Sequence, residues 1–401
     1  MSTDTAEVVV IGGGVEGLST AWALTRRGVH DVLVLERATL ASGGTGKSSG
    51  IVRCHYGIRS LAAMAWHALP VLDGSAGLLD EDTGFRGTGY LVGVGEANVE
   101  ALAANVAMHR ELGIEVELVD HGEARRLWPL ADLSDVAAFA YEPRGGYGDG
   151  HLTAQAYAAA ARRGGVRIRQ QCPVAGIEVA GGEPGGGRVT GVRTVAGELI
   201  GAGQVVVAAG PWSPALVGPV GIELPIRAQR AQILLVDPGG PVGEVPVFSD
   251  LVSLQYVRLE GSRSLLVGDS DHSAPEWADP DRYSERADDD YLVGAVEKFG
   301  ARFPGLESPR LSSSYAGCYD VTPDYNPVLS GCPVDGLWLC AGFSGHGYKI
   351  SPAVGDLMAD LICFGTSKRP DVDQDDFRWD RFATGNLLRS PHPYVGAGEM
   401  R

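Results

Sequence analysis

The fold is decided by residues 7–36, EVVVIGGGVEGLSTAWALTRRGVHDVLVLE. The β-branched run of residues 7–11 is typical of a buried strand, and residues 32–35 predict a second strand. Between them, residues 18–27 are rich in Ala and Leu and end at Gly28, which predicts a helix with a glycine stop. A strand, a helix and a strand within about 30 residues predict a βαβ unit.

The turn between the first strand and the helix carries the pattern Gly-x-Gly-x-x-Gly at residues 12–17. The first glycine permits the tight turn, the second lets the backbone reach a pyrophosphate, and the third lets helix and strand pack closely. The pyrophosphate would lie at the helix N-terminus, and Glu36 would accept hydrogen bonds from ribose hydroxyls. The alternative is a tight turn without a ligand. We expect cofactor contacts at Gly12, Gly14, Val15, Glu16, Glu36 and Arg37.

Composition excludes several classes of protein. The chain has 401 residues, 44% hydrophobic and 21% charged, which is ordinary for a globular protein and rules out a fibrous or wholly disordered one. Its net charge of −17 argues against nucleic acid and against an anionic membrane surface as partners. No apolar run is long enough for a transmembrane helix, and the N-terminus lacks a signal sequence. We therefore expect a cytoplasmic protein.

The six cysteines are widely spaced and include no Cys-x-x-Cys pair. A disulfide framework and a zinc cluster are therefore not expected, and we predict no metal.

Glycine-rich loops recur after predicted strands. Residues 41–58 form one, residues 208–213 another, and residues 342–349 a third. Glycine lets backbone approach a ligand closely, so these loops are expected to converge on one cofactor. Behind the last loop, Ser351 and Pro352 predict the N-cap and first position of a helix that ends near Ile362. From about residue 224 to residue 311 the chain is β-rich, with strands expected near 231–236, 253–259 and 264–267, which suggests a substrate domain.

Five segments, taken together and in this order, resemble the D-amino-acid oxidase-like flavoproteins, and within them the sarcosine oxidase and dimethylglycine dehydrogenase branch. They are residues 12–17 with Glu36, residues 43–53, residues 208–213, residues 317–324 and residues 342–349. The resemblance covers nearly the whole chain. It implies an α/β (mixed α+β) fold of the glutathione-reductase type. A Rossmann-like FAD-binding domain (1–83, 149–220 and 320–401) would accompany a discontinuous β-rich substrate domain (84–148 and 221–319).

The resemblance also implies the chemistry. The expected activity is FAD-dependent oxidation of the C–N bond of a small amine. The leading candidate substrate is a secondary or N-methylated amino acid. Hydride passes to flavin N5, the imine hydrolyses, and O2 or another acceptor takes the electrons.

Matching residues to the family's motifs assigns further sites. Lys349, Tyr319, Arg53 and His346 are expected at the active site, where Lys349 would also bind the substrate carboxylate. The alternatives are a solvent-facing Lys349, an ion-paired Arg53 and a Tyr319 that serves as a core aromatic. Further cofactor contacts are expected at Ser42, Gly43, Thr45, Lys47, Ser48, Ser49, Val174, Ala209, Gly210, Trp212, Gly345, His346, Gly347, Tyr348 and Lys349.

Three positions depart from the sarcosine oxidase pattern. Gly317 stands where those enzymes attach FAD through a cysteine, and Cys318 is one residue away, so we expect non-covalent FAD. Leu266 stands where they carry a lysine that promotes reaction with oxygen, which leaves oxidase and dehydrogenase both open. The position of the arginine that binds the substrate carboxylate in those enzymes falls near Gly50 in this sequence.

Several alternatives remain. The chain could oxidise a D-amino acid, glycine or a cyclic imino acid. It could be a beta-type subunit of a larger complex, with a second flavin on His151. An NAD-dependent dehydrogenase and a non-catalytic relative are further alternatives. The sequence does not determine the oligomeric state.

Overall fold

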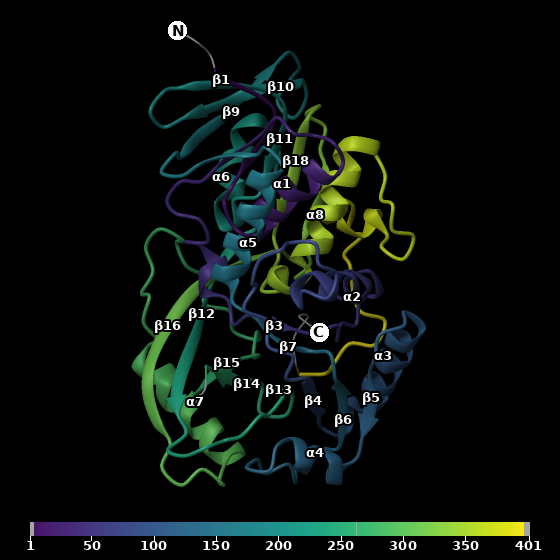
Figure 1. Cartoon of the computed structure of the whole chain (residues 1–401), viewed down its shortest axis with the longest axis vertical. Coiled ribbons are helices and arrows are strands. Elements are labelled where there is room, and N and C mark those ends of the chain that lie inside the picture. The colour runs from purple at the N-terminus through teal and green to yellow at the C-terminus, as the bar shows by residue number, and fades with distance from the viewer. Residues whose placement is uncertain (1–3, 262, 397–401) are drawn as a thin grey trace.

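The computed structural model describes residues 4–261 and 263–396 and contains two large sheets, one in each half of the molecule (Figure 1). The first sheet has the order β17-β18-β11-β1-β2-β8, with β10 pairing β11 and β9 pairing β10. Its strands are β1 (Asp4–Ile11), β2 (Val32–Leu35), β8 (Arg167–Arg169), β9 (Val174–Ala180), β10 (Arg188–Thr194), β11 (Leu199–Val207), β17 (Val328–Gly331) and β18 (Leu337–Ala341).

The centre of this sheet is parallel, because β8, β2, β1, β11 and β18 all run in one direction. Strand β1 is followed by α1 (Val15–Arg26) and then by β2 on one side, while its other neighbour β11 comes from far along the chain. The strand order therefore reverses at β1. Ligands of open α/β sheets bind at such a switch point, outside the carboxyl ends of the strands.

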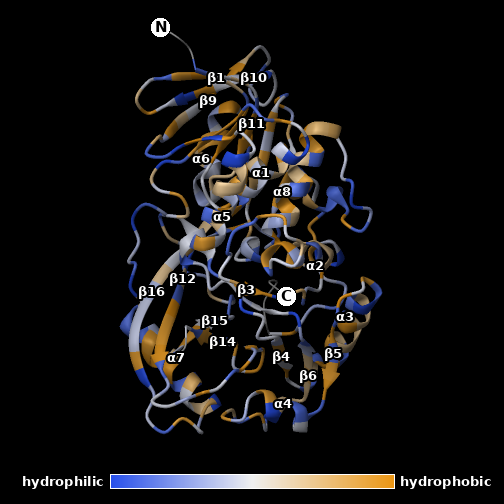
Figure 2. Ribbon diagram, viewed as in Figure 1, coloured by the Kyte–Doolittle hydropathy of each residue, from blue (hydrophilic) through white to orange (hydrophobic). Residues whose placement is uncertain are grey.

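Helices cover the sheet. Helix α1 packs against α5 (Gly150–Arg163) and α8 (Gly347–Phe364), and α8 packs in turn against α2 (Arg59–Leu72). Alternate residues of β1 serve two cores: Val8 and Val10 face the helices, whereas Val9 and Ile11 join the core beneath β9, β10 and α6 (Ser213–Val217). Figure 2 shows the apolar residues of the strands gathered inside both halves.

The second sheet has the order β16-β12-β15-β14-β13-β4-β6-β5. It joins two separate stretches of chain through the parallel pair β4 and β13. Its strands are β4 (Tyr90–Val94), β5 (Glu117–Val119), β6 (Ala138–Glu142), β12 (Arg227–Asp237), β13 (Val247–Asp250), β14 (Gln255–Glu260), β15 (Ser264–Asp269) and β16 (Arg310–Val321). The remaining helices and strands are α3 (Val99–Glu111), α4 (His121–Leu127), α7 (Asp289–Arg302), α9 (Arg381–Thr384), β3 (Ile51–Val52) and β7 (Gly146–Tyr147).

The prediction for the last long helix is wrong at its start. Helix α8 begins at Gly347, so Ser351 and Pro352 lie inside it instead of capping it. Proline cannot donate to the carbonyl four residues earlier, which belongs to Tyr348. The hydroxyl of Ser351 donates to that carbonyl at 2.9 Å, so the helix passes through the proline without leaving the oxygen unpaired.

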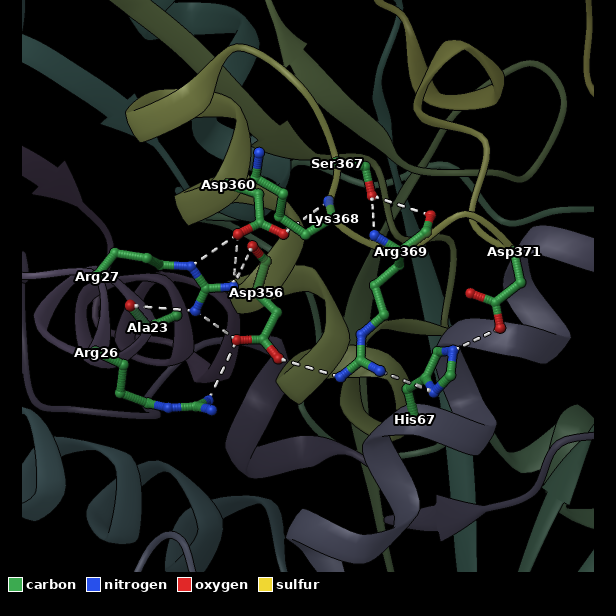
Figure 3. Close-up of polar contacts among 10 residues, drawn as sticks. All are labelled: Ala23, Arg26, Arg27, His67, Asp356, Asp360, Ser367, Lys368, Arg369 and Asp371. Carbon is green, nitrogen blue, oxygen red and sulfur yellow. Dashed lines mark hydrogen bonds and ion pairs between the residues drawn. The ribbon is translucent and has the colours of Figure 1, made fainter.

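A network of ion pairs and hydrogen bonds connects α1, α2 and α8 with residues 367–371 (Figure 3). Arg27 at the end of α1 donates to Asp356 at 2.7 Å and to Asp360 at 2.8 and 2.9 Å, both on α8. Arg369 lies 3.8 Å from Asp356 and 3.3 Å from His67 of α2. The network thus links α1, α2 and α8, which are distant from one another in the sequence. Among the described residues, no helix is both long enough and apolar enough to cross a membrane.

Candidate active site

A cavity of about 780 Å³ opens at the carboxyl ends of β1, β2, β11 and β18. Most of the residues expected to contact a cofactor line it. Those residues are Gly12, Gly14, Val15, Glu16, Glu36, Arg37, Ser42, Gly43, Thr45, Lys47, Ser48, Val174, Ala209, Gly210, Trp212, Gly345, Gly347 and Tyr348. Ser49, His346 and Lys349 are not in the wall, and neither is Arg53. Contact of each residue with a cofactor stays a prediction.

The turn between β1 and α1 requires its glycines. A Cβ at Gly12, where φ is +117°, would lie 2.2 Å from the Ala208 carbonyl oxygen, and a Cβ at Gly17 would lie 2.1 Å from that of Gly12. Gly14 is the N-cap of α1 and provides no side-chain acceptor. The Val15 N–H donates to the Thr45 hydroxyl at 3.2 Å. A helix N-terminus at a cavity whose N-cap residue has no side-chain acceptor is the arrangement that binds a pyrophosphate. These residues fit a dinucleotide such as FAD.

Glu36 is held in place at the end of β2. One carboxylate oxygen accepts the N–H of Gly13 at 2.8 Å and the other accepts the N–H of Ala38 at 2.7 Å. A carboxylate oxygen can accept further hydrogen bonds. The ribose contact of Glu36 is therefore compatible with this geometry and stays a prediction.

The predicted flavin loop forms a short 3-10 helix, Gly44–Lys47, at the edge of the cavity. The ammonium of Lys47 donates to the Tyr283 hydroxyl at 2.6 Å and to Glu285 at 2.7 Å. Ser49 turns away from the cavity wall, and its carbonyl accepts a hydrogen bond of 2.5 Å from the Arg258 guanidinium.

Residues 280–285, which we call the latch segment, were not identified from the sequence. They follow β15 and line the cavity from the side of the second sheet. Asp281 bonds to Arg37 at 2.8 Å and to the indole N–H of Trp212 at 3.0 Å, and Arg37 stacks over the Trp212 ring at 4.7 Å. The latch segment thus connects both sides of the cavity mouth. Its polar composition provided no sequence signal, because such residues are common in exposed loops.

At the other end of the cavity, the N-terminus of α8 brings Gly345, Gly347 and Tyr348 into the wall. Lys349 is 6% exposed, and its ammonium donates to the Gly345 carbonyl at 3.4 Å. His346 is also buried and contacts the Tyr56 ring, with ring centroids 5.2 Å apart. His346 and Lys349 therefore lie directly behind the wall.

Arg53 lies farther from the cavity, behind Tyr56 and His346. Its guanidinium sits over the Tyr56 ring at 4.4 Å and donates to the His55 carbonyl. Tyr56 and His346 thus connect Arg53 to the cavity end. Glu142 acts on the Arg53 guanidinium through space. Both the active-site role of Arg53 and its alternative, a structural ion pair, stay predictions.

Strand β16 supplies a third side of the cavity through Cys318, Tyr319 and Asp320. Tyr319 was expected here and Asp320 was not. Asp320 accepts the N–H of Gly342 at 2.7 Å, and burial raises the pKa of its carboxyl to about 6. Because three consecutive residues reach the wall, the one-residue shift of Cys318 does not by itself separate it from the cofactor.

A buried polar cluster lies behind Arg53. His55, His109 and Glu142 place one ligand atom each within 4.8 Å of one another. Burial raises the pKa of Glu142 to about 7 and lowers that of His109 to about 4. The Arg53 guanidinium beside this cluster repels a divalent cation, so we assign no metal here. His55 is 3% exposed, and its ring bonds to the Tyr394 hydroxyl at 2.7 Å.

The family model described as FAD dependent oxidoreductase matches residues 7–361. The chain belongs to this family, and it is a flavoenzyme that uses FAD.

Individual relatives and solved structures are similar to this chain over most of its length. Sarcosine oxidase subunit beta from Rhodobacter capsulatus is 26% identical over 95% of this chain and 90% of its own length. Human mitochondrial sarcosine dehydrogenase is 28% identical over 94% of this chain, which spans 41% of that protein. Among solved structures, L-proline dehydrogenase from P. horikoshii has a TM-score of 0.86 and 25% identity, covering 96% of this chain and 100% of that one. Glycine oxidase from Geobacillus kaustophilus has a TM-score of 0.77 at 23% identity, covers 94% of this chain and 99% of that one, and supports the fold alone.

Loss of the latch contacts should accelerate cofactor release. In Asp281→Ala, Arg37 and Trp212 lose their shared acceptor at the cavity mouth, and we expect FAD to leave the holoenzyme about 2- to 10-fold faster, the scale of partly exposed ion pairs. The rate is measured from the rise in flavin fluorescence after dilution. Glu297→Ala, an exposed change on α7, is the control. Equal rates in both variants would show that the latch segment does not retain FAD.

The raised pKa of Glu142 predicts a pH-dependent stability. Between pH 4.5 and about 7 the folded chain holds a proton that the unfolded chain has lost, so Glu142 destabilises the fold as pH rises. Relative to Glu142→Gln, the wild-type free energy of unfolding should fall by up to about 3 kcal/mol across this window. Urea unfolding at several pH values measures it. His109 is present in both proteins, so its opposite effect cancels. If the difference in unfolding free energy between wild type and Glu142→Gln did not change with pH, the raised pKa of Glu142 would be contradicted.

Proposed function

We propose that this chain oxidises the C–N bond of a small amino acid whose nitrogen is secondary or N-methylated. The names of the relatives support this, since they include sarcosine oxidase subunit beta, sarcosine dehydrogenase and 4-methylaminobutanoate oxidase. FAD supplies the redox chemistry by accepting a hydride from the substrate carbon next to nitrogen.

The pair of buried cations at one end of the cavity is the observation that carries the proposal. Lys349 is linked to this end through Gly345, and Arg53 through Tyr56 and His346. A buried cation is stabilised by an anion that reaches it, and a substrate carboxylate is such an anion. In this proposal Lys349, directly behind the wall at Gly345, orients the carboxylate, and Arg53 adds positive potential from behind Tyr56 and His346. Tyr319 in the wall excludes water from the reacting carbon.

A cyclic secondary amine is the second candidate substrate. The likeness to L-proline dehydrogenase over the whole chain favours it. Both candidates share a secondary nitrogen and a carboxylate, so both use the same pair of cations.

The chain is also proposed to act with partner subunits, because several relatives are beta subunits of sarcosine oxidase. His151, considered for a second flavin, is exposed in the first turn of α5 and is not among the residues that line the cavity.

Removal of the Lys349 charge should weaken binding of the substrate carboxylate. In Lys349→Met, kcat/KM for N-methyl amino acids and proline should fall by about 30- to 1,000-fold, the cost of breaking a buried charge pair. Activity on the same amines without a carboxylate should change little. The assay follows anaerobic bleaching of the flavin, then reoxidation by O2 or by a dye. Lys298→Met on α7 is the control. Equal losses with and without the carboxylate would contradict this role for Lys349.

Acid precipitation should release the flavin into the supernatant. Gly317 has no thiol, and burial raises the pKa of Cys318 to about 11, so its thiol stays protonated and is a poor nucleophile. In the register of β12 and β16, Arg230 lies directly opposite Cys318, so the two side chains share one face of the sheet. A yellow pellet in wild type that becomes colourless in Cys318→Ser would instead establish a covalent bond at Cys318.

A further inference from the structure

The side chain of Glu16, in the first turn of α1, has no hydrogen-bond partner among the described residues. Its side chain is 8% exposed and lines the cofactor cavity, yet neither carboxyl oxygen is bonded to any described residue. The two other buried carboxyls in the wall differ, because Glu36 and Asp320 both accept backbone N–H groups. An unpaired buried carboxyl costs stability, so a group that is bound in the functional protein is expected to pair with it.

The groups around Glu16 do not stabilise an anion. The titratable groups that interact electrostatically with Glu16 are Asp320 of β16, Cys340 of β18 and Tyr157 of α5. On α8, Glu16 Oε1 would lie 2.5 Å from a Cβ at Gly347, while Tyr348 bonds to Thr153 and Lys349 donates to Gly345. Neither side chain of α8 is hydrogen-bonded to a Glu16 oxygen.

This environment favours the protonated form of Glu16. Burial, with a smaller contribution from the like charge of Asp320, raises its pKa well above 4.5. The N-termini of α1 and α8 carry partial positive charge and favour an anion nearby, but the cofactor phosphates are the better anion for that position. A neutral carboxyl has one O–H donor, which suits an oxygen-rich ligand.

We propose that Glu16 is a cofactor-binding residue that keeps its proton and donates a hydrogen bond to an oxygen in the pyrophosphate and ribityl part of FAD. Ionised, the same side chain would repel the two negative charges of the pyrophosphate. FAD retention is therefore linked to one proton. The proposal depends on the cofactor and not on the substrate, so its failure and that of the proposed function are distinguishable.

Release of FAD from the holoenzyme, followed by fluorescence across a pH series, tests this proposal. Wild type should release FAD faster as Glu16 ionises, with a slope that approaches tenfold per pH unit. Glu16→Gln retains a donor but has no titrating group, so its release should stay slow and independent of pH. Glu100→Gln, an exposed change on α3, should follow wild type. A wild-type rate that is independent of pH, or a Glu16→Gln profile equal to wild type, would overturn the proposal.

Two further measurements keep the proposal falsifiable. Asp320→Asn removes the like charge that raises the Glu16 pKa, so it should move the pH at which release accelerates to a lower value without abolishing the slope. Loss of the slope would assign the proton to Asp320 instead. If Glu16→Gln does not fold, urea unfolding of the wild-type holoenzyme is compared with that of the wild-type FAD-free chain across the same pH series. The midpoint of the holoenzyme should fall more steeply with pH, and equal slopes would overturn the proposal.

Discussion

The cofactor cavity depends on the close contact between the β1–α1 turn and the end of β11. The Gly12 backbone passes so near the Ala208 carbonyl that a Cβ would lie 2.2 Å from it. This close approach occurs where the parallel strands β1 and β11 end, and it places the first turn of α1 over their carboxyl ends. The N-cap residue Gly14 has no capping side chain, and the first turn of α1 lines the cavity, which is where a phosphate binds in such a fold.

The rest of the cavity is built around that edge of the sheet from distant parts of the chain. β2 supplies Glu36, and β18 leads into the loop before α8, whose N-terminus forms the opposite end. The second sheet supplies the remaining wall through β16 and the latch segment. Because the side chains come from both sheets, the cavity is complete only when the two halves of the molecule are packed together.

Much of this arrangement could be predicted from local patterns. The strands at β1 and β2 are continuous apolar runs because both faces are buried, and that pattern needs no tertiary information. β16 was missed because its first half, including Ser312 and Ser313, is exposed and polar. The start of α8 was placed too late, since the pairing of the Ser351 hydroxyl with the Tyr348 carbonyl cannot be seen in a sequence.

The sequence by itself determined the dinucleotide turn, the order of the glycine loops and, through its resemblance to a family, the cofactor and the class of chemistry. These follow from residues close together in the chain, where spacing sets geometry directly. Only the tertiary structure decided that Arg53 lies behind Tyr56 and His346 and that Asp281 of the latch segment joins Arg37 to Trp212. The tertiary structure also decided that the Glu16 carboxyl has no hydrogen-bond partner among the described residues. Each of these depends on contacts between segments far apart in the chain, and burial and pairing are properties of such contacts and not of local spacing.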